Sequence, residues 1–179
     1  PSGLAGPAFT AEFIRQNALP IIAHEYQHLI NAARRLYING ADEFETVWLN
    51  EGLSHAAEEL MFYAASGLSA ASNLGYADLE GATGAIDAFN AYMSGNFSNY
   101  AAYLEKPDTA SLMGVDRLPT RGATWSFLRY AADRSGLADA AFFTALVNAR
   151  EAGLDNLRDV LGANPLPWMR DWTVSVYAD

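Results

Sequence analysis

Apolar residues recur at three- and four-residue intervals along almost the whole chain, and alternation at every second residue is nearly absent. The first pattern gives a helix one apolar face, whereas the second is what a half-buried strand requires. Only residues 173–177 offer a short alternating run, and we predict that they are helical as well. The sequence therefore predicts one all-α domain that spans residues 1–179.

Glycine, proline and capping residues set the expected helix ends. Residues 1–9 contain Gly and Pro and are expected to be irregular. A short helix is predicted over 11–17, and Pro20 is predicted in the first turn of a separate helix over 21–38, which Asn39-Gly40 ends. The other expected helices cover 46–65, 84–93, 100–104, 120–134, 139–149, 154–161 and 167–176, with loops over 66–82 (with short helical turns) and 111–119.

Composition excludes several functional classes. The 21 acidic and 11 basic residues give a formal net charge of −10, which is poorly suited to binding nucleic acid or an anionic membrane surface. No apolar run approaches the roughly 18 residues that a membrane-spanning helix needs. The absence of cysteine excludes a disulfide scaffold, a thiolate zinc finger and a cysteine nucleophile.

All three histidines fall within 32 consecutive residues, and two of them belong to the motif H-E-x-x-H at His24–His28. Residues four apart lie one above the other on a helix, so both imidazoles can bind one zinc ion. Glu25 lies about 100° round the helix from His24, beside the metal, where it can act as a general base. A zinc site needs a third protein ligand, and Glu51 and His55 are both candidates, one turn apart on the next helix.

The stretch W-L-N-E-G-L-S at residues 48–54, after a helical H-E-x-x-H, resembles the gluzincin metallopeptidases. The wording W-L-N-E-G is similar to that of the aminopeptidase N group. The combination of H-E-Y-Q-H with N-E-G-L-S-H-A-A-E-E is more similar to the hyicolysin-type secreted peptidases of bacteria. The resemblance covers residues 20–62, and Arg121-Gly122-Ala123 at the start of a later helix also resembles that group.

The resemblance implies that His24, His28 and Glu51 bind one zinc ion. It also implies that Glu25 is the general base that activates a zinc-bound water for peptide-bond hydrolysis. The 22 residues between His28 and Glu51 are about four more than the group usually has. Four residues are about one helical turn, which a longer first helix can absorb while the ligands still face each other.

Three further residues are candidates for supporting roles. His55 is expected to orient Glu51 or a water beside the metal, or else to be a polar residue on a helix–helix seam. Glu58 either holds a ligand imidazole or pairs with Arg34 or Arg35. Arg121 is the preferred stabiliser of the oxyanion, ahead of the tyrosines at 100, 103 and 130, and its alternative is a surface cation.

Gluzincins hold the substrate on the edge of a β-sheet that precedes the metal-binding helix, and no such strands are expected here. The resemblance therefore implies the helical, C-terminal-type subdomain of a zincin without its upstream sheet, and the start at Pro1 without a leader favours a processed protein or an excised domain. The function expected is a zinc endopeptidase, secreted or at the surface of a bacterium, that acts on peptides or proteins. Its isolated helical part could lack activity.

Two other hypotheses remain. The first is a helical interaction module with a structural or vestigial zinc, held by His24, His28, Glu51 and His55. The second is a helical protein in which the motif is coincidental.

Overall fold

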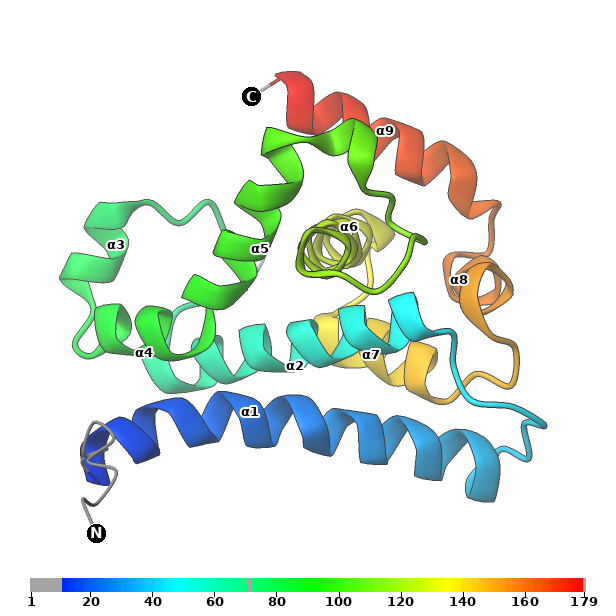
Figure 1. Cartoon of the computed structure of the whole chain (residues 1–179), viewed down its shortest axis with the longest axis horizontal. Helices are drawn as coiled ribbons and strands as arrows, with labels where there is room; N and C mark the ends of the chain where they lie inside the picture. The colour runs from blue at the N-terminus through cyan, green and yellow to red at the C-terminus, as the bar shows by residue number, and fades with distance from the viewer. Residues whose placement is uncertain (1–10, 71, 179) are drawn as a thin grey trace, which may run out of the picture.

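The computed structural model describes residues 11–70 and 72–178, and every regular element in these ranges is helical (Figure 1). The prediction of an all-α chain is thus confirmed for the described residues, while the expectation for residues 1–9 lies outside them. No helix in these ranges is both long and apolar enough to cross a membrane. The helices are α1 (Ala11–Ala32), η1 (Ala33–Ile38), α2 (Val47–Ser66), α3 (Tyr76–Gly81), α4 (Ala85–Tyr92), α5 (Ser94–Glu105), η2 (Pro107–Thr109), α6 (Leu118–Ser135), α7 (Asp139–Val147), α8 (Gly153–Leu161) and α9 (Pro165–Ala178).

The first helix is continuous through Pro20, so the predicted division into a short helix and a second helix that begins near Pro20 is wrong. A proline removes one backbone donor, but the residues on either side can keep their helical conformation. The last turns, from Ala33 to Ile38, widen into a π-helix. This segment brings the buried Arg35 against residues 149–151, where its side chain donates to three backbone carbonyls.

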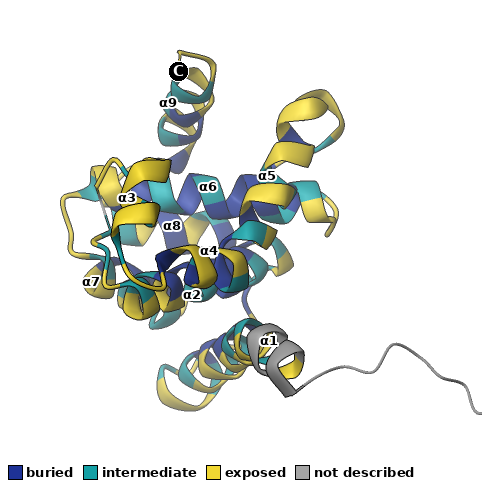
Figure 2. Cartoon of the chain, turned by 90° about the vertical axis from the view of Figure 1, so that its left-hand side faces the viewer, coloured by how far each residue is buried: buried dark blue, intermediate teal, exposed yellow. Residues whose placement is uncertain are grey.

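Helix α2 crosses the middle of the molecule, and α1 runs antiparallel to it along one side (Figure 1). The helix α6 crosses α2 and packs against it (Figure 1), and many of the buried residues lie on these two helices (Figure 2). Leu49, Leu53 and Ala56 are buried in the core, whereas Leu60 and Ala64, which continue the same helical spacing, are exposed. The core around α6 includes the large apolar side chains of Phe127, Leu128, Phe142, Leu146 and Trp172.

The helices α5 and α6 cross closely at Gly122. A Cβ atom at Gly122 would lie 2.3 Å from backbone atoms of Asn99 and Tyr100, so only glycine fits at this crossing. The helix α5 begins at Ser94 and not near Tyr100, and α6 begins at Leu118 and not at Thr120. A proline in the first turn of α6 costs no hydrogen bond, because the backbone N–H groups of that turn have no partner within the helix. The longer helix places Arg121 beside α2.

Candidate metal centre

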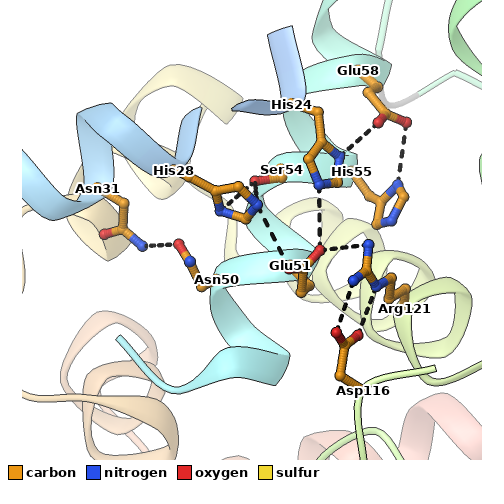
Figure 3. Close-up of polar contacts among 10 residues, drawn as sticks. All are labelled: His24, His28, Asn31, Asn50, Glu51, Ser54, His55, Glu58, Asp116 and Arg121. Carbon is orange, nitrogen blue, oxygen red and sulfur yellow. Dashed lines mark hydrogen bonds and ion pairs between the residues drawn. The ribbon is translucent and has the colours of Figure 1, made fainter. Parts of the chain in front are cut away.

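The H-E-x-x-H segment of α1 faces the N-E-G segment of α2, and the two helices bring His24, His28 and Glu51 together (Figure 3). His24 Nε2 lies 3.3 Å from Glu51 Oε2, and His28 Nε2 lies 3.6 Å from Glu51 Oε1. One ligand atom from each of the three residues lies within 4.8 Å of the others. Two imidazole nitrogens and one carboxylate oxygen form a donor set that could hold a metal ion.

Glu58 connects two histidines behind this group. Its Oε1 lies 2.8 Å from His24 Nδ1, and its Oε2 lies 3.2 Å from His55 Nδ1 (Figure 3). A carboxylate accepts hydrogen bonds, so this contact assigns the proton of His24 to Nδ1 and leaves the Nε2 lone pair facing Glu51. Burial opposes the charged form of Glu58, but the hydrogen bonds from the two histidines outweigh it and lower the pKa of Glu58.

Of the alternatives for Glu58, the structure shows the contact with an imidazole, because its hydrogen bonds are to His24 and His55. Arg34 and Arg35 point elsewhere, to Asn148 and Glu45 respectively. His24 is itself buried. Burial disfavours its charged form, yet the hydrogen bond to Glu58 and the nearby carboxylates raise its pKa above the ordinary value.

His28 has a contact that the sequence motifs do not suggest. The hydroxyl of the fully buried Ser54 lies 3.1 Å from His28 Nδ1. Ser54 is one turn beyond Glu51 on α2, so the helix that supplies the carboxylate also supplies this contact. The i, i+3 spacing of Glu51 and Ser54 places both on one face of the helix. The sequence still does not single out Ser54 as a contact of His28, because serines are common on helices.

Arg121 reaches the same site from the first turn of α6. Its Nη1 lies 2.9 Å from Glu51 Oε2, while Nε and Nη2 donate to the two oxygens of Asp116 at 2.7 and 2.8 Å (Figure 3). The hydrogen bonds from Arg121 lower the pKa of Asp116. Arg121 is thus partly buried and pairs with two carboxylates, and Asp116 is a residue that the sequence analysis missed.

The predicted general base Glu25 follows His24 on α1 and is exposed to solvent. It is not one of the clustered ligand residues, and its expected place beside the metal stays a prediction. Its charge is among those that raise the pKa of Arg121, after the hydrogen bond to Asp116, so it lies within electrostatic reach of the site.

His55 does not join the group formed by His24, His28 and Glu51. It forms a second group of possible metal ligands with His24 and Glu58, again within 4.8 Å. The two groups share His24, and in the second Glu58 already forms hydrogen bonds with Nδ1 of both histidines. Among the described residues, Glu51 rather than His55 is therefore the one that completes a site with both histidines of the motif.

The surroundings of one oxygen of Glu51 bear on metal binding by His24, His28 and Glu51. Glu51 Oε2 is buried and accepts no hydrogen bond from the described residues, because its contact with Arg121 is an ion pair without hydrogen-bond alignment. This oxygen already meets the positive charge of Arg121 Nη1 at 2.9 Å. Metal binding at His24, His28 and Glu51 is therefore supported by the donor set of the three residues.

Comparisons with protein-family models, with curated proteins and with solved structures find no match to this chain. The likeness of residues 20–62 to the gluzincins therefore remains a prediction from the motifs. The residues described above are the whole basis for assigning a function.

Proposed function

We propose that this chain is the helical part of a zinc-dependent metallopeptidase, with His24, His28 and Glu51 as the zinc ligands and Glu25 as the general base. The observation that carries the proposal is the convergence of the three ligand atoms within 4.8 Å, with Glu25 in the same H-E-x-x-H motif as His24 and His28. A structural zinc site has no use for an exposed carboxylate next to a ligand, whereas a hydrolase requires one.

The side chains of the site can be given roles in peptide hydrolysis. A bound zinc ion would polarise the scissile carbonyl and make water a better nucleophile. Glu58 keeps the His24 proton on Nδ1, which leaves Nε2 free as a ligand. Glu25 takes a proton from the attacking water and delivers it to the leaving amine. Arg121, held by Asp116, donates to the oxygen of the scissile carbonyl.

The proposed substrate is a peptide or protein cleaved at internal bonds, and the proposed location is outside a bacterial cell or on its surface. The described residues contain no strand that could pair with an extended peptide. Substrate binding on a sheet edge, as in the gluzincins that the motif resembles, would thus use residues other than these.

The second candidate is an interaction module with a structural zinc. The observation in its favour is the second ligand group, in which His55 is more than nine-tenths buried and contacts Glu58. Such a buried site would hold an ion without access for a substrate.

The substitution Glu25→Gln separates the two candidates. The peptidase proposal predicts unchanged zinc content and a fall of about 10²- to 10⁴-fold in the cleavage of an unfolded protein such as reduced casein. The assay uses the complete protein, and Glu80→Gln, at an exposed glutamate of α3, is the matched control. Unchanged cleavage by the Glu25→Gln variant would contradict the proposed role of Glu25. Zinc bound without any cleavage by the wild type would favour the structural site.

A further inference from the structure

The guanidinium of Arg121 stands between two carboxylates that differ in how they hold it. Asp116 accepts two hydrogen bonds, from Nε at 2.7 Å and from Nη2 at 2.8 Å, which fixes the plane of the group. Glu51 Oε2 is 2.9 Å from Nη1 but is not aligned as a hydrogen-bond acceptor. Arg121 is thus held in place by hydrogen bonds to Asp116 and interacts with Glu51 mainly through the attraction of opposite charges.

The oxygen that Arg121 contacts is also the one that faces His24. Glu51 Oε2 lies 3.3 Å from His24 Nε2, so an ion bound by His24 and Glu51 would sit close to this oxygen. A divalent cation and a guanidinium repel each other across a distance of a few ångströms, most strongly where water is scarce. The metal ion and the guanidinium would therefore both be attracted by the negative charge of Glu51.

We propose that Arg121 is an internal counter-ion that competes with the metal for Glu51, and that Asp116 limits this competition by holding and partly neutralising the guanidinium. The inference rests on the metal site of the proposed function. When the metal takes Glu51, Nη1 loses its contact with Oε2 while Asp116 keeps the guanidinium at the site. The competition therefore sets how tightly the metal binds and keeps Arg121 next to it.

The two members of the pair are expected to affect zinc affinity in opposite directions. Zinc affinity is measured by competition with a chromophoric chelator at fixed pH and salt. Arg121→Gln is expected to bind zinc about tenfold more tightly than the wild type, because the competing charge is removed. Asp116→Asn is expected to bind it about three- to tenfold more weakly, because the charge of Arg121 is then less neutralised. A purely structural role would weaken binding in both variants.

Two controls separate this effect from net charge and from folding. Arg117→Gln makes the same change in charge at an exposed residue four positions earlier, and its zinc affinity is expected to stay within about twofold of the wild type. The double variant Arg121→Gln/Asp116→Asn is expected to behave like Arg121→Gln, because Asp116 acts through Arg121. Thermal unfolding with and without zinc gives a second readout, in which Arg121→Gln lowers the Tm of the metal-free protein and enlarges the rise on zinc addition.

The outcomes are distinguishable. Weaker zinc binding by Arg121→Gln would show that Arg121 supports Glu51 as a ligand, and it would overturn the inference. Equal zinc affinity in Arg121→Gln and the wild type would overturn it while leaving the proposed metal site intact. Zinc binding by neither chain would overturn both. If Arg121→Gln does not fold, Asp116→Asn decides: weaker binding supports the inference, and unchanged or tighter binding overturns it.

Discussion

Glu45 and Glu51 are two carboxylates at and near the start of the same helix, and they differ in what surrounds their oxygens. Glu45 is buried and fully engaged by protein donors: Oε1 accepts from the backbone of Thr46 and Gly153, and Oε2 accepts from Arg35 and Asn156. Its cluster joins η1, the start of α2 and the start of α8. Both oxygens of Glu45 thus accept hydrogen bonds from other groups of the protein.

Glu51 has no such set of donors. Its Oε2 is buried without a hydrogen bond and faces a histidine nitrogen and a guanidinium. The two carboxylates thus differ in their partners: Glu45 is closed by neutral and charged donors of the fold, whereas Glu51, the proposed metal ligand, has an oxygen without an aligned donor that faces Arg121 and His24. The predictions below test each side of this comparison, from the largest expected effect to the smallest.

Among the partners of Glu45, substitution of Arg35 is expected to have the largest effect, because its side chain is fully buried with Glu45. Arg35→Met is expected to lower the free energy of unfolding by about 3–5 kcal/mol, because it leaves the Glu45 charge buried without its cationic partner. Urea denaturation measures the effect. Arg34→Gln is the matched control, since Arg34 contacts only the side chain of Asn148 among the hydrogen bonds described, and about 1 kcal/mol is expected. A loss below about 1 kcal/mol in Arg35→Met would contradict the structural role of the cluster.

The crossing that positions Arg121 is tested at the next residue. Gly122→Ala is expected to destabilise the protein by about 3 kcal/mol, because the added Cβ would meet the α5 backbone at 2.3 Å and force the helices apart. Gly95→Ala provides the opposite case, because nothing lies within 4 Å of a Cβ there. It is expected to stabilise by about 0.5–1 kcal/mol, as alanine does in helices. Equal effects in thermal unfolding of the two variants would rule out the close approach at Gly122.

The proposed metal site is tested at Glu58, whose two oxygens form hydrogen bonds with His24 and His55. Glu58→Gln keeps the size of the side chain but replaces one acceptor by a donor, so one imidazole loses its partner. Zinc affinity is expected to fall about 10- to 100-fold. The exposed Glu105 offers a control, Glu105→Gln, for which chelator competition should show no change. Unaltered affinity in Glu58→Gln would mean that Glu58 does not orient a ligand.

The neighbouring Glu59 lies on a different face of α2, where it accepts a hydrogen bond from Trp125 Nε1. Burial raises the pKa of Glu59 to about 7 from an ordinary 4.5, although Arg129 opposes the shift. Between these values the folded state binds more protons than the unfolded state, so stability falls as the pH rises, by at most about 1.4 kcal/mol per pH unit. In Glu59→Gln this contribution is expected to vanish. Parallel stability curves for the variant and the wild type between pH 4.5 and 7 would refute the shift.

Much of this arrangement follows from the sequence, because local rules govern it. The second helix was predicted over 46–65 and is found at Val47–Ser66, since Thr46 and Gly67 mark its ends. His24 and His28 lie one helical turn apart, so the motif alone predicts that they share a helix face, and the resemblance of the N-E-G stretch to the gluzincins predicts Glu51 as the third ligand. Glu58 follows from the same helical periodicity, seven residues after Glu51.

Other features depend on contacts that no local pattern contains. The start of α5 and the glycine at its crossing with α6 depend on how two helices pack. Asp116 and Ser54 become part of the site only because the loop before α6 and the seam between α1 and α2 bring them there. Glu51 and His55 share a face of α2, so only the position of α1 distinguishes them.

The most direct test of the central claim is the zinc content of the purified chain, measured by inductively coupled plasma mass spectrometry after reconstitution, for the wild type beside Glu51→Ala. The account predicts about one zinc ion per wild-type chain and its loss in the variant, because two histidines alone do not complete a site. No zinc in the wild type, or the same zinc content in Glu51→Ala, would contradict it.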